Sequence, residues 1–112
     1  MLPAAQRLRR TSDIQSVYKT GRATFTPAVR VLAKATQLAQ NRATVVVSTR
    51  VSKKAVERNR LKRQLRATLR KLLMQTNGTH DIVIIVQPKA LKVDTTQLIS
   101  ALIFCFNKLH LL

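Results

Sequence analysis

The segment from Arg50 to Lys71 limits the possible folds of this chain most strongly, because it combines dense positive charge with a helical leucine pattern. It holds ten of the chain's 21 Lys and Arg residues and one acid, Glu57. At about 100° per residue, two residue classes separate onto opposite sides of a helix. One side carries Leu61, Leu65, Thr68, Leu69, Leu72 and Leu73, and the other carries Asn59, Arg60, Arg63, Arg66 and Arg70. After a connection over residues 49–54, the segment is therefore predicted to be a helix that packs with its leucines and exposes its cations.

The exposed side of this helix indicates a polyanionic ligand. Like charges three or four residues apart each destabilise a helix by a few tenths of a kcal/mol, so a helix built for solubility would intersperse Glu. Arginine presents a planar fork that matches phosphate oxygens, and Asn59 adds a donor and an acceptor suited to sugar or base edges. A mixed charge run usually indicates only a solvated face, but the single sign here favours binding.

Composition indicates one compact domain over residues 1–112, since 112 residues with 46% hydrophobic content can form one core. A net charge of +17 points to a nucleic acid, or less strongly to an anionic membrane surface, and does not choose between RNA and DNA. The single Cys105 lies in an apolar run, where it is expected to fill core space in a reducing compartment. We expect a cytoplasmic protein, because no signal peptide or apolar run of roughly 20 residues is visible.

The N-terminal third is expected to contain a basic arm, a helix and a strand. Residues 1–11 lack periodicity and are expected to form a flexible basic arm. Ser12 with Gln15 has the spacing of a capping box, and the helix it would start should stop at Gly21. From Val29 apolar and polar residues alternate, which predicts a half-buried strand.

The rest of the chain is expected to alternate between strands and helices. Residues 44–48 contain four β-branched residues in succession and predict a central strand, and the continuous apolar run over residues 82–86 predicts another. Asn77 and Gly78 suit the end of the basic helix, while Asp94 with Gln97 caps a final helix. The expected fold is α+β, a single-domain α/β sandwich of order α-β-β-(β)-α-β-α with a central sheet of about four strands. The basic helix would be the crossover of a β-α-β unit.

The polypeptide carries no pattern that indicates catalysis or metal binding. Its four acids, Asp13, Glu57, Asp81 and Asp94, are each explained by a helix start, an ion pair within the basic helix or a strand edge. Two-metal chemistry needs clustered carboxylates, and no Cys or His spacing indicates zinc. With two glycines there is no glycine-rich phosphate-binding loop, and one Tyr and three Phe argue against a stacking platform of the RRM type. We therefore expect no catalytic residue, no protein-bound metal and no organic cofactor.

The run Arg58-Asn59-Arg60-Leu61-Lys62-Arg63 resembles the signature helix of the bacterial ribonuclease P protein component, Arg-Asn-Arg-x-Lys-Arg. The similarity extends from about Leu8 to Leu109. It includes the segment 13–21, the Val-rich strand ending at Ser48, the strand over residues 81–86 and the closing helix, in the family's order and spacing.

The resemblance implies a ribonucleoprotein in which the RNA subunit, with bound Mg²⁺, removes the 5′ leader of precursor tRNA and the protein assists. The implied partners are the ribonuclease P RNA subunit and precursor tRNA, with no protein partner and no membrane. A left-handed β-α-β crossover is also implied, an exception to the usual hand. With the cationic face, the resemblance assigns RNA-subunit binding to Lys53, Lys54, Arg58, Asn59, Arg60, Lys62, Arg63, Arg66 and Arg70.

A cleft for the single-stranded leader is implied between the first helix and the sheet. Matched positions give its lining as Ile14, Tyr18, Arg30 and Leu32. The family usually has Phe at the positions of Ile14 and Tyr18, and it often has Gly where this chain reads Val51-Ser52-Lys53. Two alternatives stay open from composition: a ribosomal type of RNA-binding protein and, on charge alone, a DNA-compacting protein. Only a ribonuclease P protein should raise precursor tRNA cleavage by a ribonuclease P RNA.

Overall fold

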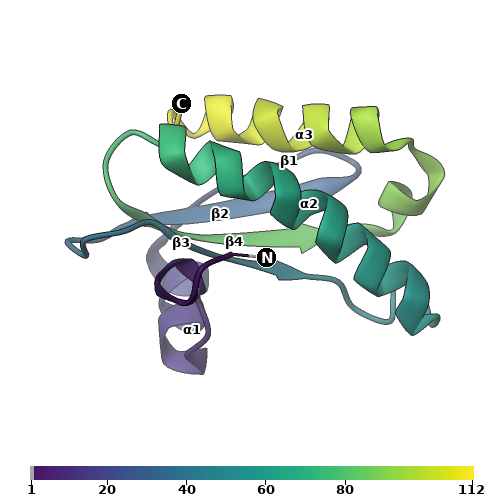
Figure 1. The fold of residues 1–112 in the computed structure, drawn as a ribbon, viewed down its shortest axis with the longest axis horizontal. Helices are drawn as coiled ribbons and strands as arrows, with labels where there is room; N and C mark the ends of the chain where they lie inside the picture. Colours follow the sequence, from purple (N-terminus) through teal and green to yellow (C-terminus); the bar gives the residue numbers. More distant parts are fainter. Residues whose placement is uncertain (1) are drawn as a thin grey trace.

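The chain folds into a four-stranded mixed sheet with helices on both faces (Figure 1). The computed structural model describes residues 2–112. The elements are η1 (Ala4–Gln6), α1 (Thr11–Thr20), β1 (Arg22–Phe25), β2 (Val29–Ala35), β3 (Arg42–Val46), α2 (Ala55–Gln75), β4 (His80–Val86), η2 (Pro88–Lys92) and α3 (Thr95–Lys108). This order confirms the predicted α+β class, and β1 is the additional strand for which the prediction left room.

The strands lie in the order β1-β2-β4-β3. β2 is antiparallel to both β1 and β4, whereas β3 and β4 are parallel neighbours. Parallel neighbours need a crossover connection, and α2 is that connection, as predicted. The register aligns Val31 of β2 and Val45 of β3 with Ile84 of β4, so these three side chains lie on one face of the sheet.

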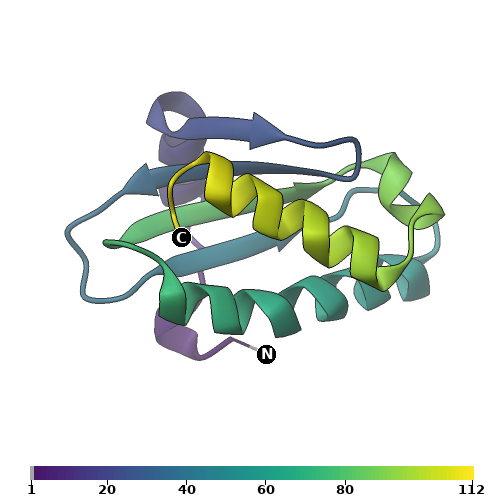
Figure 2. The ribbon, with the colours of Figure 1, turned by 90° about the horizontal axis from the view of Figure 1, so that it is seen from above.

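α2 and α3 lie side by side over this face and enclose the main core (Figure 2). The leucine side of α2 points inward as predicted, with Leu65 and Leu69 fully buried and Thr68 half-buried. α3 begins with the predicted capping box. The backbone N–H of Gln97 donates to Asp94 Oδ1 at 2.8 Å, and the backbone N–H of Asp94 donates to Gln97 Oε1 at 3.1 Å.

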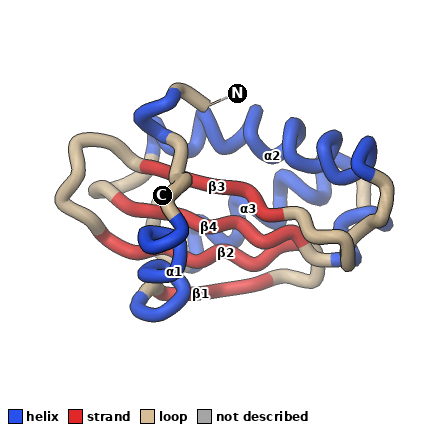
Figure 3. The backbone as a smooth tube through the Cα atoms, turned by 90° about the horizontal axis from the view of Figure 1, so that it is seen from below, coloured by secondary structure: helices blue, strands red, loops and turns tan. Residues whose placement is uncertain are grey.

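α1 crosses the opposite face near one end of the sheet (Figure 3). Val17 packs there with Leu8, Leu32 and Val83 in a second, smaller core. At the same end, Arg42 of β3 donates two hydrogen bonds to Asp81 of β4, at 2.8 and 2.6 Å, and a weaker one to Asp13 of α1 at 3.4 Å. This pairing, chiefly the hydrogen bonds to Asp81, raises the pKa of Arg42. Arg42 therefore joins β3 to β4 through Asp81 and, by the longer contact with Asp13, joins β3 to α1.

The start of the chain differs from the sequence-based expectation. α1 begins at Thr11, and Ser12 already lies inside its first turn, so the predicted Ser12 and Gln15 capping box is wrong. Leu2 and Leu8 are buried, and the backbone N–H of Leu8 donates to the carbonyl of Ala43 at 3.0 Å. The segment 1–11 was expected to be a flexible basic arm; residue 1 lies outside the described residues, and at Arg7 and Leu8 the segment pairs with the outer edge of β3.

Candidate RNA interface

The outward side of α2 is cationic, and within the described residues none of its cations forms an ion pair with an acidic side chain. Asn59, Arg60, Arg63 and Arg70 are exposed, while Lys62 and Arg66 are half-buried. Within residues 2–112 both ion pairs belong to Arg42, so no carboxylate neutralises a cation of α2. Glu57, expected to form an ion pair within this helix, instead accepts a hydrogen bond from the Ser52 hydroxyl at 2.6 Å.

The loop before α2 is fixed by its own polar contacts. Val51 and Ser52 are buried, and the Ser52 hydroxyl accepts a hydrogen bond from the backbone N–H of Lys54 at 3.1 Å. Arg58 donates through Nη1 to the carbonyl of Ser52 at 2.9 Å and is half-buried. One of the predicted RNA-binding arginines therefore helps to hold the loop, while Lys53 and Lys54 stay exposed at the helix start.

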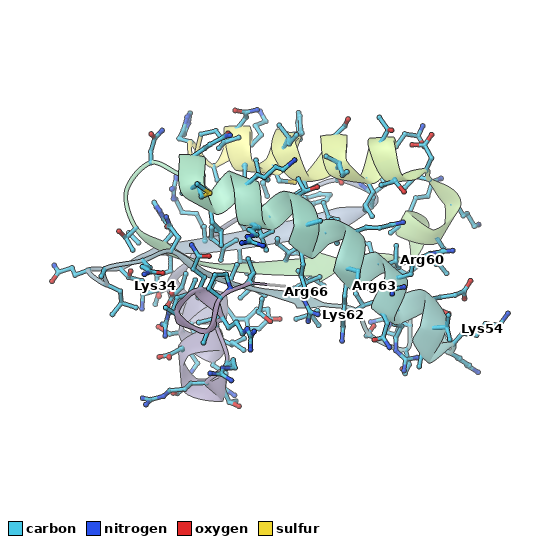
Figure 4. The ribbon with its side chains drawn as sticks, viewed as in Figure 1. Lys34, Lys54, Arg60, Lys62, Arg63 and Arg66 are labelled. Atoms are coloured by element: carbon cyan, nitrogen blue, oxygen red, sulfur yellow. The ribbon has the colours of Figure 1, made fainter. Side chains whose placement is uncertain are left out.

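The structure brings only part of the predicted set together on α2. Asn59, Arg63 and Arg66 line a shallow depression of about 420 Å³ together with the exposed Val56. Figure 4 shows Lys62, Arg63 and Arg66 extending from the side of α2 that faces β3 and the N-terminal segment. Because these side chains lie on a rigid helix, they present closely spaced donors that suit the repeating phosphates of a nucleic acid backbone.

A second surface lies where α1 leaves the sheet uncovered, and we call it the open sheet end. The register places four side chains in one row across the strands: Phe25, Arg30, Ile85 and Val46. Phe25 is 70% exposed, Arg30 is exposed, and the other two are half-buried. Figure 3 shows that this end of the sheet lies next to the loop that leads from β3 into α2. An aromatic ring beside a guanidinium on an open sheet offers both stacking and phosphate contact.

The structure places the four predicted leader-cleft residues at different depths. Tyr18 is 44% exposed on α1 and Arg30 is exposed on β2. Ile14 is half-buried against the smaller core. Leu32 is only 2% exposed beneath α1, so it supports the helix and cannot form the surface that a ligand would touch. Phe25, for which the sequence predicts no role, is exposed beside Arg30 on the same face of the sheet.

The chain's donor set does not fit a magnesium site. Within residues 2–112 no three His, Cys, Asp or Glu side chains cluster. Asp13 and Asp81 are used by Arg42, and Asp94 caps α3. Cys105 is fully buried, as expected for a core residue, and burial raises the pKa of its thiol.

The fold and its basic helix define a small nucleic-acid-binding protein of the α+β class. Among residues 2–112, no helix is long and apolar enough to span a bilayer. The family model described as Ribonuclease P matches residues 2–110. The chain therefore belongs to the ribonuclease P protein component family, the protein part of the endoribonuclease that matures the 5′ end of tRNA.

Individual relatives agree with this membership. The chain is 43% identical over 95 residues to the ribonuclease P protein component of Pseudanabaena sp., covering 82% of this chain and 80% of the relative. It is 37% identical over 118 residues to that of Cyanothece sp., covering 91% and 90%. The structure of the Staphylococcus aureus RNase P protein superposes with a TM-score of 0.84 at 23% identity, over 95% of this chain and 96% of that one, which supports the fold. These findings decide against the ribosomal and DNA-compacting alternatives.

Proposed function

We propose that this protein binds the catalytic RNA subunit of ribonuclease P through α2 and the loop before it. The observation that carries the proposal is the cationic side of α2, which stands opposite a buried leucine side and has no acidic partner within residues 2–112. The proposed contacts are Lys53, Lys54, Arg58, Asn59, Arg60, Lys62, Arg63, Arg66 and Arg70. Repulsion among these cations is relieved when a phosphate backbone lies against them.

The 5′ leader of precursor tRNA is proposed to bind the open sheet end. Arg30 would contact the leader backbone, and Phe25 and Tyr18 would each offer an aromatic face to an unstacked base. Ile14 and Leu32 belong to this site indirectly, because they pack α1 against the sheet. The bond-breaking step and its Mg²⁺ ions belong to the RNA subunit, and the protein binds and orients the two RNAs.

Leader binding can be tested with the assembled enzyme and precursor tRNAs that carry either a long or a very short leader. Phe25→Ala and Tyr18→Ala should each weaken binding of the long-leader substrate by about 1 to 3 kcal/mol and leave the short-leader substrate unaffected. Phe104→Ala is the matched control, since Phe104 is a half-exposed phenylalanine on α3. Equal losses for both leader lengths would remove the tested residue from the leader site. Failure of the wild-type protein to raise cleavage by a ribonuclease P RNA would contradict the whole proposal.

A further inference from the structure

A row of three charged side chains, which we call the polar row, crosses the sheet beneath α1. The register pairs Lys34 of β2 and Arg42 of β3 with the same residue of β4, Asp81, so all three lie on the face that α1 covers. α1 contacts both ends of this row. The Ser16 hydroxyl accepts a hydrogen bond from Lys34 Nζ, and the Asp13 carboxylate accepts one from Arg42. We propose that the polar row positions α1 for the 5′ leader, so that it sets leader affinity without touching the leader.

Arg42 is the fixed point of the polar row. Its Nε and Nη2 atoms donate to the Asp81 carboxylate at 2.8 and 2.6 Å, and its Nη1 atom donates to Asp13 Oδ2 at 3.4 Å. Asp81 is 5% exposed, and a carboxylate at that depth needs a paired cation. Because the guanidinium is planar, the two bonds to Asp81 determine where the third nitrogen points. Arg42 therefore holds Asp13, and with it the start of α1, at a defined place over the sheet.

The apolar contact beneath α1 does not by itself set the rotation of this helix. Within Thr11–Thr20, Val17 is the one fully buried residue, and apolar burial has no preferred direction. At about 100° per residue, Asp13 and Ser16 lie on one side of Val17, whereas Tyr18 lies on the other. A rotation of α1 about its axis would therefore break the polar contacts and move Tyr18 relative to the sheet. The contacts of Asp13 and Ser16 oppose that rotation.

The residue before Arg42 connects the same place to α2. Asn41 Nδ2 donates to the carbonyl of Leu73 in α2 at 3.2 Å, and Asn41 Oδ1 accepts from the backbone N–H of His80 at 2.7 Å. Two successive side chains at the start of β3 thus reach helices on the two faces of the sheet. This role rests on the proposed function, in which α2 binds the RNA subunit and α1 contributes to the leader site. Asn41 and Arg42 then hold the two sites in one relative geometry, which favours productive alignment of the two RNAs.

The orientation of α1 can be measured without RNA. Spin labels are attached at Gln15→Cys on α1 and Met74→Cys on α2, both exposed positions, while the buried Cys105 stays unlabelled. Pulsed electron paramagnetic resonance then gives the distribution of distances between the labels. This distribution should widen when Asp13→Asn and Ser16→Ala together remove the contacts of α1 with the polar row. An unchanged distribution would overturn the proposal.

The matched control combines Ser12→Ala with Asp94→Asn. It also changes one serine of α1 and one acid near a helix start, so the net charge rises equally. Ser12 is exposed, and Asp94 caps α3 on the opposite face of the sheet, where Asn is an equally good cap. The control should leave the distance distribution unchanged. Arg42 is kept in every variant, because its removal would leave Asp81 buried and unpaired.

The assembled enzyme provides the second readout. Loss of both polar contacts should weaken binding of long-leader precursor tRNA by about fivefold to tenfold and change short-leader binding by less than about twofold. The control should stay within about twofold for both substrates. When Tyr18→Ala is added, the combined loss should be much smaller than the product of the separate losses, because the polar row acts through α1. Equal losses for both leader lengths, or fully multiplicative losses, would overturn the proposal.

Tyr18→Ala alone separates a failure of this proposal from a failure of the proposed function. If Tyr18→Ala weakens long-leader binding and loss of the polar contacts does not, the leader site stands and the positioning role is refuted. If neither change affects leader binding, α1 does not contribute to the leader site and both proposals are refuted.

Discussion

Substitutions on the two sides of α2 should separate stability from RNA binding. Leu65 is fully buried between α2 and the sheet, and Leu65→Ala removes three side-chain carbons. At about 0.8 kcal/mol per buried carbon, the lost transfer free energy is about 2.4 kcal/mol. The cavity that remains adds to this, so the free energy of unfolding should fall by roughly 3 to 4 kcal/mol. At about 4 °C per kcal/mol, Tm should fall by roughly 10 to 20 °C.

Arg63→Ala provides the comparison on the outward side of the same helix. Its free energy of unfolding should change by less than about 0.5 kcal/mol, because Arg63 is exposed. Its affinity for the RNA subunit should fall, and the slope of log affinity against log salt should flatten by a little under about one unit. Urea denaturation gives the stabilities, and filter binding at several salt concentrations gives the slopes.

Two results would show that the sides of α2 are assigned wrongly. One is clear destabilisation by Arg63→Ala, and the other is a loss below about 0.5 kcal/mol for Leu65→Ala. Leu65→Ala binding must be measured at a temperature where the variant is folded, and its affinity for the RNA subunit should then match the wild type.

Two further substitutions test other parts of the fold. Gly21→Ala should destabilise the protein by about 1 to 3 kcal/mol, because the new Cβ would lie 2.5 Å from the Val17 carbonyl oxygen and 3.0 Å from the Ala33 carbonyl oxygen. An unchanged urea midpoint would contradict this close approach. Burial, and secondarily the charge of Arg22, lowers the pKa of His80 below its ordinary 6.5. As the pH falls, the unfolded chain therefore takes up a proton on this histidine at a higher pH than the folded protein does. The stability that His80 contributes should therefore be fully present above about pH 6.5 and be lost as the pH falls below that value. Urea denaturation at several pH values should show a smaller loss for His80→Gln than for the wild type.

Periodic and local signals in the sequence were enough to predict much of the fold. The leucine spacing of α2 placed its buried side correctly, and its exposed side except for the half-buried Arg66, because a single period of 3.6 governs all of its 21 residues. The capping box of Asp94 was readable because it involves only residues three apart. The β-branched runs identified β3 and β4; β4 is buried on both faces of the sheet for most of its length, whereas β3 is buried on one face and half-buried on the other.

Features set by long-range pairing could not be predicted in this way. β1 is a four-residue edge strand whose residues are mostly exposed, so it carries no apolar alternation. The burial of Leu2 and Leu8 depends on the edge of β3, which lies far along the chain. Leu32 shares a face with Arg30, as the alternation predicted, but only the position of α1 determines that one is covered and the other open.

The central proposal is that α2 faces the RNA subunit while the open sheet end faces the leader, and cleavage of RNA from a cysteine-tethered radical source tests it most directly. The single native thiol, Cys105, is fully buried, so a cysteine added at the surface can be labelled selectively. Val56→Cys places the label at a 78% exposed position on the outward side of α2, and Ala23→Cys places it on β1 on the same face as Phe25. In the enzyme assembled with precursor tRNA, the label at 56 should cleave the RNA subunit and the label at 23 should cleave the leader. Cleavage of the same RNA from both positions, or of the leader from position 56 alone, would contradict the proposal.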